Sequence, residues 1–259
     1  MKKYIIVALC AMALFSCSDE EDNTWAIIFK ENVRSDADPV YKTEKFLFDN
    51  ERLIQHSIEQ MYAEDDITHE VNLTYSDNKV TVSSDGLTLI YTLNAEGYAS
   101  QCIYSSPLQN RIYSFSYSME GYLTKIVESI DGKEHSTASF TYEDGDLTSV
   151  SSYLNNYESK FIYEPGEASS NYHLPCLGLL EIYPLNFHIE ALYAGLLGKD
   201  PRHFTVRSSP EGNDDEHTTY TYKFDKEGNP TKMGCETMYA KGQQAIYYPN
   251  TRSISISFE

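Results

Sequence analysis

The chain has 259 residues, a formal net charge of −19 and 41% hydrophobic side chains, with 22 tyrosines. This length fits one large β domain or two smaller ones, and the apolar content is sufficient for a buried core. The acidic balance argues against nucleic acid as a partner, because binding to a phosphate backbone requires a basic patch.

Residues 1–16 have the features of a secretory signal. Two lysines precede an apolar run from Tyr4 to Phe15, which is shorter than the about 20 residues that a membrane-spanning helix needs. The run ends in Leu14-Phe15-Ser16-Cys17, which resembles a bacterial lipobox. The resemblance implies cleavage before Cys17, acylation of its thiol and attachment to a membrane through this lipid. An ordinary signal peptide with an incidental cysteine is the alternative.

An acidic segment follows this cysteine, and it consists of Ser18, Asp19, Glu20, Glu21 and Asp22. It resembles the export tag of Bacteroides-type lipoproteins, which implies display on the outer face of the outer membrane. A solvated acidic linker is the alternative. The mature chain keeps 18 basic and 39 acidic side chains, a net charge of −21, which suits a protein that must not adhere to anionic lipopolysaccharide. We assign residues 17–40 to a lipidated, acidic tether and residues 41–259 to a single antiparallel β domain.

The β domain is predicted from a repeated unit, of which Tyr113 to Val127 is the clearest copy. Three aromatic residues alternate with serines before a turn at Gly121, so the aromatics share one face of a strand and the serines the other. Gly97, Gly121 and Gly145 follow one another at intervals of 24 residues, about the length of two strands and two turns. Such a repeat indicates an antiparallel hairpin meander. The unit resembles the tyrosine–aspartate repeats of large bacterial surface proteins.

The remaining elements follow in chain order. Residues 53–62 fit either a helix or a strand, and the neighbouring repeats favour a strand. Hairpins continue to residue 164, and a long connection leads to a helix at about 184–197, in which Pro184 suits the first turn and Gly198 the end. Its apolar face consists of Leu185, Ile189, Leu192, Tyr193 and Leu196. Hairpins resume at about residue 203 and run to the C-terminus.

About 13 strands are expected in total, and a sheet of this size curls on itself. The prediction is therefore a half-barrel or barrel with one amphipathic helix packed against it or inside it. A transmembrane barrel is the alternative, and it requires an outward apolar band. The lipobox, the acidic charge and a helix that needs apolar cover argue against it.

Three features in this order resemble a known family: aromatic-x-Tyr hairpins, the Leu174-Pro175 linker, and the segment from Tyr193 to Gly198. The family comprises Bacteroides-type lipoproteins with a domain of unknown function that is described as having a porin-like β fold. The resemblance covers about residues 40–259. It implies the fold and an outer-membrane location, and it carries no catalytic residues.

The chain lacks Gly-x-Ser-x-Gly, His-Glu-x-x-His, P-loop and Gly-x-Gly-x-x-Gly motifs, so we predict no catalytic residue, metal or cofactor. His173 and Cys176 have the spacing of metal ligands but stand alone in an apolar linker. The acidic clusters at 214–216 and 225–229 could contact calcium, but both are expected at hairpin turns, where acidic residues are common for structural reasons. The cysteines at 102, 176 and 235 are expected to be buried and inert, although one disulfide among Cys102, Cys176 and Cys235 remains open.

The leading interpretation is a surface-exposed lipoprotein that binds a ligand or partner without catalysis. A glycan is one candidate, because exposed tyrosine rings can stack on sugars. Two alternatives remain. The first is a carrier that holds an apolar ligand in the half-barrel, which requires a displaceable helix. The second is a glycan-acting hydrolase with dispersed carboxylates, since their spacing across a sheet is not visible in a sequence.

Overall fold

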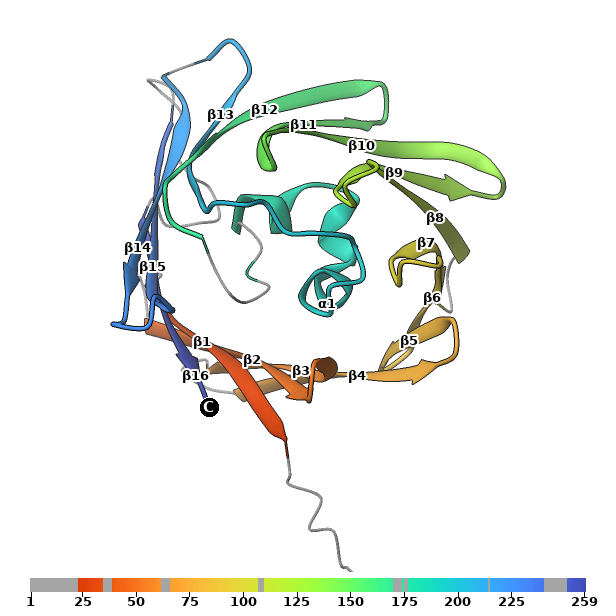
Figure 1. The fold of residues 1–259 in the computed structure, drawn as a ribbon, viewed down its shortest axis with the longest axis horizontal. Helices are drawn as coiled ribbons and strands as arrows, with labels where there is room; N and C mark the ends of the chain where they lie inside the picture. Colours follow the sequence, from red (N-terminus) through yellow and green to blue (C-terminus); the bar gives the residue numbers. More distant parts are fainter. Residues whose placement is uncertain are drawn as a thin grey trace, which may run out of the picture.

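The computed structural model describes residues 23–34, 39–61, 66–106, 110–169, 174, 177–213, 215–239 and 251–259. In these residues sixteen antiparallel strands form a closed barrel around a short helical segment (Figure 1). β1 closes the barrel against β16, with Ile27 opposite Phe258 and Glu31 opposite Ile254. The expected barrel is therefore confirmed, with three strands more than the sequence predicted.

Every strand pairs with its neighbours in the chain, apart from the closing pair. The strands are β1 Thr24–Arg34, β2 Pro39–Asp49, β3 Arg52–Met61, β4 Asp66–Ser76, β5 Lys79–Ser84, β6 Leu87–Leu93, β7 Ala99–Ser105, β8 Asn110–Tyr117, β9 Leu123–Ile130, β10 Lys133–Glu143, β11 Asp146–Leu154, β12 Tyr157–Pro165, β13 Thr205–Pro210, β14 His217–Phe224, β15 Pro230–Met238 and β16 Thr251–Phe258. Between β12 and β13 lie two 3-10 helices, η1 Leu177–Glu181 and η2 Leu185–Phe187, and one α-helix, α1 Ile189–Tyr193.

The alternation read from the sequence sets which side chains face the lumen. In β8, Tyr113 and Phe115 are buried inside the barrel, whereas Ser114 and Ser116 are exposed on its outer wall. Because successive side chains of a strand point to opposite faces, one hairpin unit supplies both the apolar lining and the polar exterior. The prediction that the aromatic residues of the repeat share one face of the strand and the serines the other is confirmed.

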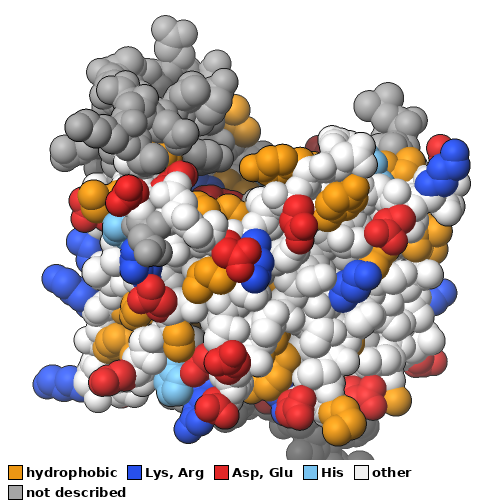
Figure 2. All heavy atoms as spheres, turned by 90° about the horizontal axis from the view of Figure 1, so that it is seen from above, with side chains coloured by type: hydrophobic (Ala, Val, Ile, Leu, Met, Phe, Trp, Pro, Cys, Tyr) orange, Lys and Arg blue, Asp and Glu red, His pale blue; other side chains and the backbone are white. Residues whose placement is uncertain are grey.

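The outer wall is polar in the strands that follow as well. Thr137, Ser139 and Thr141 of β10 alternate outward with the buried Ala138 and Phe140. Figure 2 shows one side of the wall, where charged and uncoloured side chains separate scattered hydrophobic ones. A transmembrane barrel has the reverse polarity, with apolar residues outward and polar residues inward.

The barrel has two different ends. We call the end where β1 begins and β16 finishes the base, and the opposite end the mouth. The turns at Gly97, Gly121 and Gly145 lie at the base, and all three glycines have positive φ, at 87°, 94° and 89°. Gly121 also lies beneath the ring of Tyr98, at 3.2 Å from the position that a Cβ would take. The positive φ therefore favours glycine at all three turns, and close packing adds to this requirement at Gly121.

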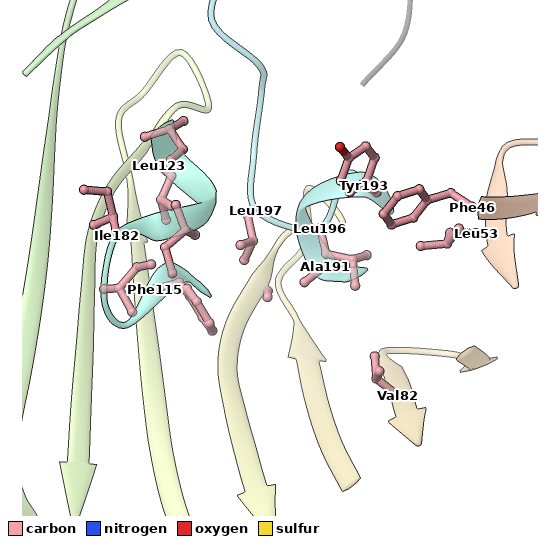
Figure 3. Close-up of a cluster of buried hydrophobic side chains, with 14 of the residues drawn as sticks. Phe46, Leu53, Val82, Phe115, Leu123, Ile182, Ala191, Tyr193, Leu196 and Leu197 are labelled. Atoms are coloured by element: carbon pink, nitrogen blue, oxygen red, sulfur yellow. The ribbon is translucent and has the colours of Figure 1, made fainter. Parts of the chain in front are cut away.

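Residues 166–204 leave β12 at the base and return there to β13, and their described part, which we call the plug, lies inside the barrel (Figure 1). Backbone hydrogen bonds attach it to the base: the N–H groups of Lys199 and Arg202 donate to the carbonyls of Gly121 and Gly145, both at 2.9 Å. Tyr193 stacks on Phe46 of β2, with ring centroids 3.8 Å apart (Figure 3). The plug therefore supplies the core of the barrel.

The predicted helix at 184–197 is wrong in extent. The structure has a 3-10 turn, then the five-residue α1, then turns. Gly195 has a φ of 69° and ends the helix, because this left-handed conformation is incompatible with a continuing α-helix. Leu192, which the apolar stripe placed in the core, is only partly buried. The barrel wall surrounds the plug, so side chains on all sides of the plug can be buried. The plug therefore does not need a long amphipathic helix with a single apolar face.

The predicted boundary of the tether at residue 40 also needs correction. Residues 24–34 form β1, because Trp25, Ile27 and Phe29 alternate inward and join the core. The β domain thus begins at Thr24. The ambiguous residues 53–61 do form a strand, as predicted, and Tyr62 lies outside the described residues. Residues 240–250, which belong to the hairpins expected between residue 203 and the C-terminus, also lie outside them.

Candidate functional site

Among the described residues, two cavities lie in the mouth half of the lumen, one on each side of η1. The first, the charged cavity, has a volume of about 280 Å³. Its lining residues come from β1, β2, β16 and the plug: Phe29, Glu31, Lys42, Glu44, Leu180, Glu181, Ile189, Tyr193, Arg252 and Ile254.

Ion pairs organise the charged cavity. Arg252 donates from Nε and Nη2 to the two carboxylate oxygens of the buried Glu31, at 2.6 and 2.8 Å. Lys42 Nζ lies 2.8 Å from Glu44 Oε2. A bidentate hydrogen bond between arginine and a carboxylate is strong and directional. With both ion pairs formed, the acidic and basic side chains on this wall of the cavity are largely paired.

His56 connects the wall of the charged cavity to the plug. Its Nε2 lies 3.0 Å from Glu44 Oε1, and its Nδ1 lies 2.7 Å from Glu190 Oε1 of α1. Burial alone would lower the pKa of His56, but the hydrogen bonds and charges of Glu190 and Glu44 outweigh it and raise the pKa to about 9. For Glu44 burial is likewise outweighed, by the hydrogen bond with His56 and the charge of Lys42, so its pKa falls to about 2. His56 is therefore a cation at neutral pH, between two carboxylates.

The second cavity, the hydroxyl-lined cavity, has a volume of about 380 Å³. Aromatic and hydroxyl side chains dominate its lining, which consists of Ser152, Leu154, Tyr157, Ser159, Phe161, Tyr163, Gly178, Glu181, Ile182, Tyr183, Ser208, Thr218 and Tyr220. This volume is at the small end of the range of about 300–1,000 Å³ that is typical of small-molecule sites, and the charged cavity, at about 280 Å³, lies just below that range. Glu181 at the end of η1 lines both cavities.

A buried carboxylate fixes the plug beside the hydroxyl-lined cavity. Glu128 of β9 has no exposed surface and accepts hydrogen bonds from Arg111, Tyr183 and Ser136, each at 2.7 Å. Burial alone would raise the pKa of Glu128, but the bonds from Tyr183, Ser136 and Arg111 lower it below its usual range. Tyr183 belongs to the plug, so this network ties the plug to the wall.

Towards the base, the side chains of the described residues pack closely. A cavity of only about 10 Å³ is left between the plug and β14–β16, where Tyr193, Phe204 and Met233 are among the lining residues. Leu185, Leu196 and Leu197 of the plug are buried in the common core. This packing leaves the mouth half as the part of the described lumen with space for a ligand.

His188 in the plug is fully buried among aromatic rings. Its Nδ1 lies 2.8 Å from the hydroxyl of Tyr91, and its Nε2 has no hydrogen-bond partner among the described residues. Burial lowers the pKa of His188 to about 3, so the ring is neutral. The ring meets Tyr113 edge to face, at a centroid distance of 4.4 Å, and its place is that of a core residue.

The site residues predicted from the sequence lie elsewhere or outside the described chain. Cys17, the acidic segment 18–22, His173, Cys176 and Asp214 are outside the described residues. Cys102 and Cys235 are buried and free, as expected, and burial raises the pKa of the Cys102 thiol to about 12. Asp225 caps its own turn by accepting from the backbone N–H groups of Glu227 and Asn229.

The sequence carries one signal of the mouth, the alternation of Tyr157, Ser159, Phe161 and Tyr163. This alternation has the same pattern as the other strands of the repeat, so it does not by itself indicate a cavity. All four residues line the hydroxyl-lined cavity. The charged residues of the other cavity are far apart in the chain, and the closure of the barrel brings Glu31 and Arg252 together.

Comparisons with known proteins agree with this architecture. The model of a family described as a domain of unknown function (DUF4595) with porin-like fold matches residues 47–232. The chain is also similar to a solved structure, a porin-like protein from Bacteroides uniformis, at 27% identity and a TM-score of 0.82 over 90% of this chain and 97% of that one. No curated protein matches the chain. Within the part of the chain that the structure describes, no helix has the length and apolar content that crossing a membrane requires.

Proposed function

This chain belongs to the DUF4595 family, a domain of unknown function with a porin-like fold, and we propose that it is a lipid-anchored outer-membrane protein that binds a small ligand at the barrel mouth. The observation that carries the proposal is the contrast between the two ends of the lumen as the described residues form it. Cavities of about 280 and 380 Å³ lie at the mouth, whereas the cavity among the described side chains towards the base measures about 10 Å³.

The orientation of the chain supports the same proposal. β1 begins at the base, and seven residues from Cys17 to Asn23 precede it. A chain of this length spans at most about 25 Å. An acylated Cys17 would therefore hold the base at the membrane and direct the mouth outward. The polar outer wall supports a barrel whose outside is in contact with water. The acidic segment from Ser18 to Asp22 supports display of the protein on the cell surface.

Binding at the mouth is favoured over transport of an apolar ligand inside the barrel. A carrier would have to displace the plug, which buries Leu185, Leu196 and Leu197 and is hydrogen-bonded to the base turns. Removing large apolar side chains from such a core costs several kcal/mol, about 2–5 for each leucine. The open cavities at the mouth need no such rearrangement.

A hydrolase is the second candidate, because Glu181 lines both cavities. The side chain of Glu181 is 66% exposed, and the burial of its remaining part raises its pKa against the opposing charge of Arg252, whereas the pKa of Glu44 is lowered to about 2. Carboxyl groups whose pKa values are moved apart are typical of an acid and base pair. Release of reducing ends from oligosaccharides by the wild type, and its loss in Glu181→Gln, would support this candidate.

The binding proposal is tested by filling one cavity. Ser159 points into the hydroxyl-lined cavity, and the next residue, Lys160, points outward. In a thermal-shift screen of saccharides, nucleosides, dipeptides and fatty acids, we expect hits whose affinity falls at least tenfold in Ser159→Trp and stays within twofold in Lys160→Trp. A protein that binds no compound, or that binds equally well after Ser159→Trp, would contradict a ligand site in this cavity.

A further inference from the structure

The inward face of β12 forms one continuous side of the hydroxyl-lined cavity. Three of its four inward residues carry aromatic rings and the fourth, Ser159, carries a hydroxyl, from Tyr157 at the rim to Tyr163 at depth. The exposed fraction falls from 72% for Tyr157 to 3% for Tyr163. This wall therefore offers a sequence of aromatic surfaces that leads from solvent into the lumen.

The adjacent strands β13 and β14 supply hydroxyl groups. Ser208 and Tyr220 lie 3.1 Å apart through their side-chain oxygens, and Thr218 lies beside them in the lining. A hydroxyl donates one hydrogen bond and accepts two, so such groups keep the capacity to bond a ligand after bonding one another. On β12, the Ser159 hydroxyl makes no hydrogen bond with another described residue.

We propose that the hydroxyl-lined cavity is a binding site for a neutral saccharide. A sugar ring has a C–H face that packs on an aromatic ring and hydroxyl groups that exchange hydrogen bonds with Ser, Thr and Tyr. The wall of β12 provides the first kind of contact, and β13 and β14 provide the second. A cavity of about 380 Å³ that opens at Tyr157 admits one end of a longer chain.

Charge restricts the saccharide to a neutral one. Glu181 is the one carboxylate, and there is no lysine or arginine, among the residues that line this cavity. The mature chain carries a net charge of −21, so its field repels anionic sugars such as uronates. The same argument excludes phosphorylated and sulfated saccharides as good ligands.

This inference rests on the proposed binding function, and it is tested by isothermal titration with named sugars. The probes are maltohexaose, xylohexaose, mannohexaose and cellohexaose, with hexagalacturonate as the anionic comparison. We expect at least one neutral hexasaccharide to bind and hexagalacturonate to bind at least tenfold more weakly. Tyr157→Ala should weaken the neutral sugar at least tenfold, because it removes the stacking surface at the rim.

Tyr153 provides a matched control on the same hairpin. It is 40% exposed, pairs with Glu158 on the outer face of the barrel and does not line the cavity. Tyr153→Ala should change the affinity for the neutral sugar by less than twofold. Circular dichroism and the melting temperature verify that both variants fold.

The outcomes separate the two proposals. If no neutral sugar binds while another compound class binds and is lost in Ser159→Trp, the saccharide assignment is wrong and the ligand site stands. If sugars bind equally to the wild type and Tyr157→Ala, this wall is not the subsite. If no compound of any class binds, both proposals fail.

Discussion

Among single residues, Gly198 of the plug packs closely against the barrel wall. It has a φ of 89°, and an added Cβ would lie 2.5 Å from the carbonyl oxygen of Gly121 and 3.1 Å from the ring of Tyr117. We expect Gly198→Ala to lower the free energy of unfolding by about 2–4 kcal/mol, as the sum of backbone strain and overpacking. Urea denaturation followed by circular dichroism measures the change.

Gly97→Ala separates the two contributions. Gly97 has nearly the same φ, 87°, but no atom within 4 Å of the position of a Cβ. Its replacement should therefore cost only the backbone term, about 1–2 kcal/mol. Equal losses in the two variants would show that close packing at Gly198 contributes nothing to stability.

The raised pKa of His56 predicts that the free energy of unfolding depends on pH. Its pKa rises from 6.5 to about 9 on folding, so the charged His56 stabilises the folded state fully below pH 6.5, and this contribution is lost as the pH rises through about 9. The contribution is at most about 3 kcal/mol, from 1.36 kcal/mol for each pKa unit. Between pH 6.5 and 9.5 the wild type should lose stability, and His56→Asn should be nearly flat in chemical denaturation.

His69 provides the control for this measurement. It lies exposed on the neighbouring β4, and His69→Asn should keep the slope of the wild type. An unchanged slope in His56→Asn would contradict the assignment of the cation to His56.

The sequence does not reveal this residue as a buried cation, because its partners Glu44 and Glu190 come from β2 and α1, which only the closed barrel brings together.

Among the elements, the hairpins could be predicted from the sequence and the plug only in part. A strand is a local pattern: Tyr113, Phe115 and the serines between them determine their faces without reference to the rest of the chain. The plug depends on what surrounds it. The apolar stripe from Leu185 to Leu196 has helical spacing, but Gly195 and the contacts of the barrel wall stop the helix at Tyr193.

The stability of the plug should reflect the observed burial. Leu185 is 1% exposed and Leu192 is only partly buried. We expect Leu185→Ala to cost about 2–5 kcal/mol, as in other cores, and Leu192→Ala less than half as much. Thermal and urea denaturation compare the two variants. A larger loss from Leu192→Ala would show that the helical stripe read from the sequence describes the plug better than the packing does.

For the whole molecule, the barrel was predictable and its mouth was not. The number of repeats requires a curled sheet, whereas a cavity depends on which inward residues remain uncovered by the plug. Glu31 and Arg252 illustrate the difference: they lie at opposite ends of the chain and meet only because β1 pairs with β16.

The proposed lipid anchor at Cys17 predicts how the protein is attached to the cell. Cys17→Ala should release the protein from membranes into the soluble fraction, because the described barrel has a polar outer wall. Replacing Asp19, Glu20, Glu21 and Asp22 by alanine should keep the acylated protein membrane-bound but protect it from protease added to intact cells. Immunoblots of cell fractions with and without protease measure both effects. Membrane retention of an unacylated Cys17→Ala protein would refute the anchor, and protection of the wild type to the same extent as the alanine variant would refute the export tag.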